Sequence, residues 1–160
     1  MVQVLRALPF LGLLLMLASC DPNQIYEKNT DFKDFTWAVQ EKPAFEFEIK
    51  DTTQRYNVYF NIRNASAYGY YNLYVKHTLS DPNGKRVSQL LHQMVLMDPQ
   101  TGEPRGSGTG DIFDHQFLAL PNQRFHVAGT YKLVLEQYMR QDQLPGIMAA
   151  GVRVAKTEAK

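Results

Sequence analysis

Apolar and polar residues alternate with a period of two along several stretches of the chain. Residues 45–50, 56–63 and 71–79 each place apolar side chains at every second position, with mostly charged or amide side chains between them. Successive side chains of a strand point to opposite faces of its sheet, so this alternation predicts half-buried strands. An amphipathic helix needs apolar residues three and four positions apart, and these stretches do not have that spacing.

Turn sequences separate the predicted strands. Residues 81–84 read Asp-Pro-Asn-Gly, which predicts a hairpin between 71–79 and 86–97, because proline presets φ and glycine adopts a positive φ. Further strands are expected at 131–139 and 147–154, and a short strand or helical turn at 116–120. About eight strands with almost no helix favour an antiparallel β-sandwich, either a jelly roll or an immunoglobulin-like fold.

The first twenty residues have the layout of a lipoprotein signal peptide. Arg6 supplies a positive charge, residues 7–17 an apolar core, and Ala18 and Ser19 the small residues before Cys20. A secretory signal has this order, whereas a transmembrane helix needs about 20 apolar residues. We therefore predict cleavage before Cys20, the only cysteine, after lipid attachment to its thiol. The alternative, an ordinary signal peptide with an incidental cysteine, would leave a free thiol in an oxidising compartment.

These features divide the chain into four parts. Residues 1–19 are the signal peptide, 20–34 a lipidated N-terminus and polar tether, 35–156 the sandwich domain and 157–160 a tail. The mature chain is long enough for one domain with its own core. Removal of the signal peptide leaves 16 basic and 16 acidic residues. This balance gives no support to nucleic-acid binding or a polybasic membrane contact, so membrane attachment is predicted through the lipid alone.

No residue set in the sequence has the spacing of an established catalytic site. The glycine-rich segment 106–110 is followed by Asp111, where a phosphate-binding loop requires lysine. Ser107 and His115, imagined with a nearby aspartate as a triad, lack a nucleophile elbow. We therefore predict that the protein is not an enzyme and has no cofactor beyond the acyl lipid on Cys20.

Metal ligands are also sparse. Asp98, Asp111 and Asp114 offer oxygen ligands for calcium, but calcium takes about six to eight of them. The four histidines lack the spacing of a zinc motif, and no free cysteine remains to assist them. No metal is predicted, and calcium is the single alternative. The histidines are His77, His92, His115 and His126.

Aromatic residues provide an alternative function. Most tyrosines are expected in the core, because aromatic residues favour strands. Tyr59 and Tyr74 fall on the polar faces of their strands, and residues 68–70, Tyr-Gly-Tyr, fall in a connection where binding residues often lie. Exposed aromatic rings stack on sugars. A carbohydrate-binding module is therefore the alternative, and it requires exposed tyrosines or an exposed Trp37.

Several segments, in order along the chain, resemble the GldH family of gliding motility lipoproteins. They are 20–23, 26–29, 56–64, 70–75, 96–99, 108–115, 136–142 and 144–147. The resemblance covers nearly all of the mature chain and implies a Bacteroidota-type envelope lipoprotein needed for gliding. It also implies a link to the type IX secretion machinery, with no catalytic residues and one transferred site, the lipidated Cys20. We expect an outer-membrane anchor with the domain in the periplasm or at the cell surface.

Two polar loops, 111–115 and 140–142, hold charges that neither packing nor turn chemistry requires. On a domain without an active site, such loops are natural contacts for another envelope protein. The alternative is that Asp111 and Arg140 form an ion pair that fixes the loop geometry. We expect one partner-binding patch that consists of Asp111, Phe113, Asp114, His115, Arg140 and Asp142.

The substitution Cys20→Ser tests the lipid anchor. Because the thiol accepts the lipid, the variant is expected to remain an uncut precursor without acyl chains. Incorporation of labelled palmitate and the size of the protein on a gel measure both effects. A variant that is still shortened and still labelled would contradict the prediction.

Overall fold

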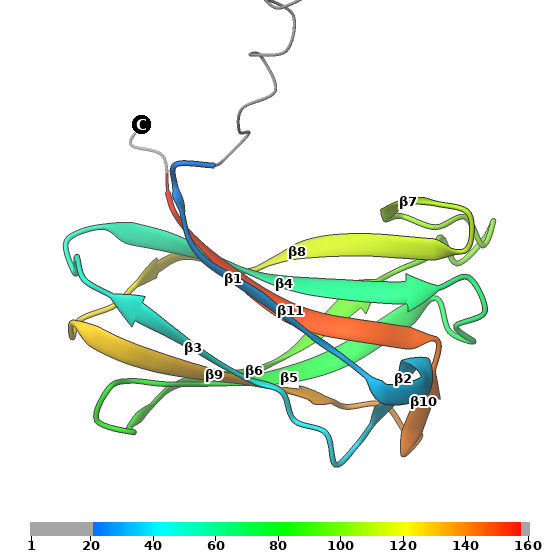
Figure 1. The fold of residues 1–160 in the computed structure, drawn as a ribbon, viewed down its shortest axis with the longest axis horizontal. Helices are drawn as coiled ribbons and strands as arrows, with labels where there is room; N and C mark the ends of the chain where they lie inside the picture. The colour runs from blue at the N-terminus through cyan, green and yellow to red at the C-terminus, as the bar shows by residue number, and fades with distance from the viewer. Residues whose placement is uncertain (1–20, 158–160) are drawn as a thin grey trace, which may run out of the picture.

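The computed structural model describes residues 21–157, which are built almost entirely from antiparallel strands (Figure 1). Cys20 and the signal peptide lie outside the described residues. The single helical element is a 3-10 turn, η1 (Lys33–Phe35), and no helix within residues 21–157 could span a membrane. The strands are β1 (Gln24–Asp31), β2 (Thr36–Ala38), β3 (Ala44–Ile49), β4 (Arg55–Ala65), β5 (Asn72–Ser80), β6 (Arg86–Val95), β7 (Ser107–Thr109), β8 (Ile112–Arg124), β9 (Gly129–Gln137), β10 (Gln143–Pro145) and β11 (Ile147–Lys156).

Two sheets form the sandwich, which confirms the predicted fold class. One has the order β1-β11-β4-β8-β7 and the other β3-β9-β5-β6, while β2 and β10 form a small separate ribbon. When the eight long strands of the described chain are numbered in sequence, the sheets read 1-8-3-6 and 2-7-4-5. Two Greek keys wrapped into a double sheet produce this order. The structure is therefore a jelly roll and not an immunoglobulin-like sandwich.

The predicted alternation is confirmed in the central strands. On β4, Tyr56, Val58, Phe60 and Ile62 face the opposite sheet and are almost completely buried. Tyr131, Leu133 and Leu135 of β9 are buried in the same way. Burial of each large apolar side chain stabilises the fold by about 1.5–3 kcal/mol, so these inner faces provide the main stabilisation.

The predicted tether is wrong over most of its length, because Gln24–Asp31 forms β1 and pairs with β11 at the edge of the five-stranded sheet. Tyr26 anchors this strand on the core, with its ring centroid 5.8 Å from that of Phe47. On the outer face, Arg153 of β11 forms an ion pair with Asp21 and a hydrogen bond with Gln24. The strand is polar because its outer face meets water, and the folded domain therefore begins before residue 35.

Strand β8 is longer than the predicted segment 116–120 and continues through Pro121 to Arg124. Proline within a sheet is tolerated at bulges, where no ladder hydrogen bond is required. The pairing of β4 with β8 shifts register at this point, and Asn122 N donates a hydrogen bond to Asn57 Oδ1 at 3.0 Å. The bulge therefore replaces the predicted strand end.

A pair of histidines lies between the sheets. His77 of β5 is fully buried, and its Nδ1 lies 2.7 Å from Nε2 of His92 in hydrogen-bonding geometry. The other ring nitrogen of His77 lies 3.0 Å from Ser88 Oγ. Burial, and then the adjacent His92, lowers the pKa of His77 from 6.5 to about 4, and burial also lowers the pKa of His92. Both rings are therefore neutral at pH 7.

Acidification is expected to destabilise the fold through His77. The unfolded chain takes up a proton near pH 6.5, whereas the folded chain resists protonation until about pH 4. The free energy of unfolding therefore decreases as the pH is lowered from 6.5 to 4, by up to about 1.4 kcal/mol per pH unit for this group. Urea unfolding across this range measures the slope. The substitution His77→Gln should reduce it and His126→Gln, at an exposed histidine, should not; equal slopes would contradict the assignment.

Candidate protein-contact site

Connections from both sheets meet at one end of the sandwich. Ser66 N, after β4, donates a hydrogen bond to Asp111 O at 2.8 Å, which joins the β4–β5 connection to the β7–β8 turn. Ala65 N donates to Gly146 O at 2.8 Å, and Gly146 N donates to Phe35 O at 2.9 Å. These bonds bring η1 and the β10–β11 turn to the same end. Most of the residues predicted from the polar loops lie there.

The structure places His115 in the interior, so its prediction as a partner-contact residue is wrong. The side chain of His115 is buried, and Nε2 lies 2.8 Å from Asn64 Oδ1. Burial lowers the pKa of this imidazole. The nearby carboxylate of Asp114 acts to raise it, but the effect of burial is larger. Sequence alone did not show this, because the buried partner Asn64 comes from β4, far away in the chain.

The neighbouring Asp114 is exposed but already paired. Its carboxylate accepts a hydrogen bond from Arg63 Nε at 2.8 Å and another from Nη2 at 3.3 Å. These bonds raise the pKa of the Arg63 guanidinium. The charge of Asp114 on β8 is therefore balanced within the domain by Arg63 of the neighbouring β4.

The remaining predicted residues lie near the surface. Asp111 is exposed and accepts a hydrogen bond from Ser66 Oγ at 3.2 Å, while Phe113 is half-buried. Arg140 and Asp142 are exposed in the loop after β9. Among the salt bridges of residues 21–157, none joins Asp111 to Arg140, so the proposed internal ion pair is not formed. The two loops share one end of the molecule but follow strands of different sheets.

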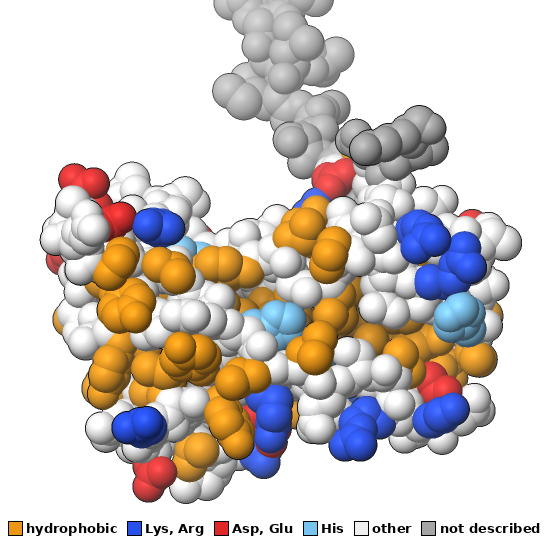
Figure 2. All heavy atoms as spheres, turned by 180° about the vertical axis from the view of Figure 1, so that it is seen from behind, with side chains coloured by type: hydrophobic (Ala, Val, Ile, Leu, Met, Phe, Trp, Pro, Cys, Tyr) orange, Lys and Arg blue, Asp and Glu red, His pale blue; other side chains and the backbone are white. Residues whose placement is uncertain are grey.

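Exposed aromatic side chains at this end favour a protein-contact surface more strongly than the charged loop residues do. Four of them come from η1, the β4–β5 connection and the loop after β9, and we call this surface the aromatic end. Figure 2 shows hydrophobic side chains gathered toward the left, which is the right-hand end of Figure 1. The residues and their exposed fractions are Phe35 (61%), Tyr70 (40%), Tyr71 (47%) and Tyr138 (58%).

Backbone strain marks Phe35. Its φ is 53°, and φ of the preceding Asp34 is 51°. A bulky residue rarely adopts this left-handed conformation, which costs on the order of 1–3 kcal/mol. Because the ring points largely into solvent, its burial does not offset that cost. A strained backbone that presents an aromatic ring to solvent makes Phe35 a candidate contact residue, which the sequence analysis did not identify.

A shallow pocket of about 520 Å³ lies beside β7, with Arg105, Ser107, His115 and Phe117 in its wall. Ser107 Oγ donates a hydrogen bond to the main-chain oxygen of Asp114 at 3.5 Å, while Nε2 of His115 is hydrogen-bonded to Asn64 Oδ1. Ser107 and His115 are therefore not arranged as nucleophile and base. The pocket wall combines charged, small and aromatic groups without the hydrogen bond that a catalytic pair needs.

The acids considered for calcium each have other partners. Asp98 accepts hydrogen bonds from the backbone N–H of Gln100 and from Arg105 at 3.0 Å, which lower its pKa to about 2. Asp114 binds Arg63 and Asp111 binds Ser66, as described above. Within residues 21–157, no group of three or more histidine, cysteine or acidic side chains is placed to hold a metal ion.

Trp37, one of the rings that the carbohydrate alternative could use if exposed, is completely buried. Its ring stacks on Phe32 with centroids 4.8 Å apart, and Nε1 donates a hydrogen bond to Glu41 O at 2.8 Å. Tyr59 is half-buried, and the guanidinium of Arg153 lies 5.1 Å from its ring centroid. Neither ring therefore offers an open platform for a sugar.

Comparison with known proteins agrees with the resemblance. The chain is 29% identical over 156 residues to the gliding motility lipoprotein GldH homolog of Christiangramia forsetii, covering 93% of this chain and 94% of that protein. It is 27% identical over 144 residues to the gliding motility lipoprotein GldH of Flavobacterium johnsoniae, covering 86% and 87%. A solved chain of infectious bursal disease virus aligns with 12% identity over 97% of this chain and 46% of its own length, but its TM-score of 0.17 is too low to carry an argument.

The model of the GldH lipoprotein family matches residues 24–154, which is almost the entire described domain. The match runs from β1 of the five-stranded sheet into β11 and includes all of β3, β9, β5 and β6, so it spans both sheets. The chain therefore belongs to the GldH family of gliding motility lipoproteins, which are proteins of the cell envelope.

Proposed function

We propose that this gliding motility lipoprotein is a non-catalytic accessory component of the gliding and type IX secretion machinery. It contacts other proteins of that machinery through the aromatic end. Interface cores are enriched in aromatic side chains, and polar residues surround them. The exposed Phe35, held in a strained backbone, is the observation that carries the proposal. Asp111, Arg140 and Asp142 supply the charged surroundings.

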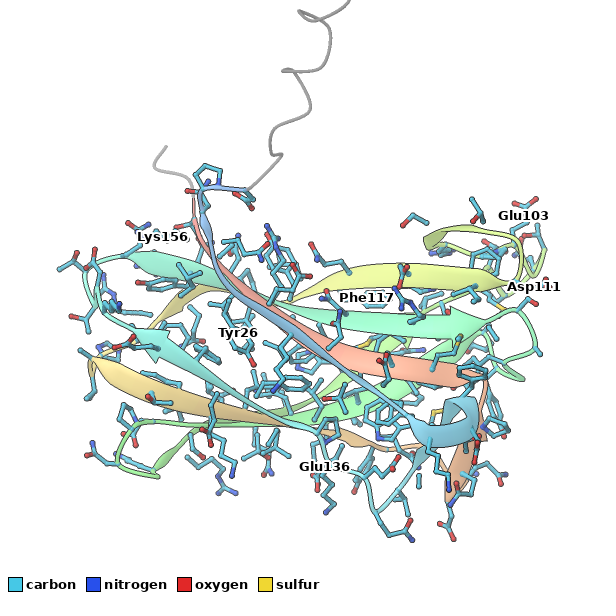
Figure 3. The ribbon with its side chains drawn as sticks, in the orientation of Figure 1. Tyr26, Glu103, Asp111, Phe117, Glu136 and Lys156 are labelled. Carbon is cyan, nitrogen blue, oxygen red and sulfur yellow. The ribbon has the colours of Figure 1, made fainter. Side chains whose placement is uncertain are left out.

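The position of the N-terminal segment supports a contact through the aromatic end, because it places that end away from the membrane. Lys156 N donates a hydrogen bond to Asn23 O at 2.8 Å, so the chain that follows Cys20 enters the domain beside the end of β11. Figure 3 places Lys156 and Asp111 toward opposite ends of the sandwich. An acyl lipid on Cys20 would hold the first end near the bilayer and leave the aromatic end directed away from it. We place the anchor in the outer membrane, with the domain in the periplasm or at the cell surface.

Removal of the exposed rings tests the contact. The triple variant Phe35→Gly, Tyr71→Ser and Tyr138→Ser is expected to lose gliding but keep its abundance and thermal stability. Glycine adopts the φ of residue 35 without strain, so this change should not weaken the fold. Spreading of colonies measures gliding, and Asn122→Gly is the matched control at a third described non-glycine residue with positive φ, 51°. Normal spreading of the triple variant would contradict the proposal.

Charge reversal tests the surroundings of the aromatic end. The combined changes Asp111→Lys and Arg140→Glu are expected to weaken gliding by opposing the partner's charges, without loss of folded protein. The exchange of Arg63→Asp with Asp114→Arg keeps an ion pair between β4 and β8 and serves as the control. A defect from the exchange alone, with none from the first variant, would assign the effect to strand pairing and not to partner contact.

A further inference from the structure

Four strands form the outer edges of the two sheets in the described chain: β1, β3, β6 and β7. An unprotected edge strand offers free backbone N–H and C=O groups to other chains, and charged or very short strands prevent this. β1 carries Glu27 and Lys28, β3 carries Glu46 and Glu48, and β7 has only three residues. β6 has ten residues, and its only charge is Arg86 at the start.

Large apolar side chains are exposed along the same strand. Leu90 and Leu91 are 55% and 51% exposed, and Val87 is 45% exposed. Figure 2 looks onto the side of the molecule opposite β1 and β3 and shows hydrophobic side chains along it. An edge strand of this length, with a single charge at its start and several exposed apolar side chains, is expected to pair with another strand.

The pairing with β5 defines the two faces of β6. Leu90 lies opposite the buried His77, and Met94 lies opposite the buried Leu73, so the even-numbered residues of this segment lie on the inner face of the sheet, although Leu90 remains exposed at its edge. The pairing is regular from Ser88 to Val95. The side chains on the outer face of this segment are therefore Gln89, Leu91, Gln93 and Val95. The first three, Gln-Leu-Gln, read the same in both directions.

We propose that β6 pairs antiparallel with β6 of a second copy of this chain, with Leu91 on the two-fold axis. The two four-stranded sheets would then join into one continuous sheet. Residues directly opposite each other must lie on the same face, which is satisfied when the axis passes through one residue. With Leu91 on the axis, Leu91 meets the partner's Leu91 and Gln89 meets the partner's Gln93.

The chemistry of the pairing favours a second copy and this register. A two-fold interface uses the same surface twice and must be self-complementary, which a palindromic order provides. On the inner face, Leu90 would lie beside the partner's His92, and Ser88 beside the partner's Met94. No charge is present from Ser88 to Met94, so no like charges meet. An axis through Leu90 would instead place Gln89 against the partner's Leu91, a polar group against an apolar one.

Cysteine crosslinking of the full-length lipoprotein in its native membrane tests the pairing. The Cβ atoms of opposite residues in antiparallel strands are about 4.5–5.5 Å apart. Leu91→Cys should therefore give a product of twice the mass with an oxidant or a short bismaleimide. Leu118→Cys, at an outer-face residue of β8 that is 50% exposed, is the matched control. Gln89→Cys should crosslink efficiently only when co-expressed with Gln93→Cys, which checks the register.

The outcomes are distinct. A Leu91→Cys variant that dimerises no more than Leu118→Cys overturns the proposal. A Leu91→Cys product that mass spectrometry assigns to a different protein also overturns it, because another strand then occupies the edge. In the native membrane, adding Leu91→Lys should abolish the crosslink between Gln89→Cys and Gln93→Cys, since like charges would meet on the axis. Adding Leu118→Lys should leave this crosslink intact, and equal crosslinked fractions with the two lysine variants would overturn the proposal.

Discussion

The fold depends on the burial of two inner faces against each other. The chain has a single cysteine, so no disulfide can form within it, and packing must supply the stability. The central strands β4, β11, β9 and β5 contribute most of the fully buried side chains. Every buried side-chain polar atom in the described residues has a hydrogen-bond partner, including those of His77 and Asn64. The apolar layer and the few polar groups inside it therefore support one arrangement of the sheets.

On the outer face of the five-stranded sheet, the edge strand β1 lies very close to β11. Gly151 of β11 lies opposite Asn29, and a Cβ atom there would lie 1.7 Å from Asn29 Oδ1 and 2.7 Å from Lys28 O. The absence of a side chain at residue 151 lets Asn29 lie across β11 and receive a hydrogen bond from Asn61 Nδ2 at 3.2 Å. The segment from Gln24 to Asp31 is thus part of the sheet, so a pull on a lipid attached to Cys20 would act on the strand ladder directly.

Sequence periodicity identified the strands with two distinct faces and missed those without them. β4 and β9 present a buried apolar face and a solvated polar face, so alternation was sufficient. β1 has one main inward anchor, Tyr26, and apart from the exposed Ile25 its other side chains are polar, so it resembled a tether. The full length of β8 was missed because Pro121 sits in a bulge, which depends on pairing with β4. Strand order also depends on pairing between distant segments, and the sequence left the choice between two sandwiches open.

The site shows the same limit. Charged loop residues were identified because charge is visible in a sequence, yet Asp114 is neutralised by Arg63 and His115 is buried beside Asn64. Both partners lie on β4, and no local pattern indicates them. The exposure of Phe35 depends on a positive φ that residue type does not predict. The exposed rings come from three connections that lie at one end of the jelly roll, and no single segment of the sequence shows that they share this end.

A lipid anchor and the open edge of β6 would both favour the association of two copies of the chain. Pairing between two short strands is weak in free solution. Attachment of every copy to one membrane confines the copies and raises their effective concentration, as a linker does for two joined domains. A modest self-complementary edge can therefore be sufficient on the membrane even where the isolated domain would stay monomeric. The same confinement would make an unprotected edge hazardous if it paired without a fixed register, and the Gln-Leu-Gln order about Leu91 provides that register. The edge strand and the anchor are thus best understood together, because the first is useful only at the local concentration that the second creates.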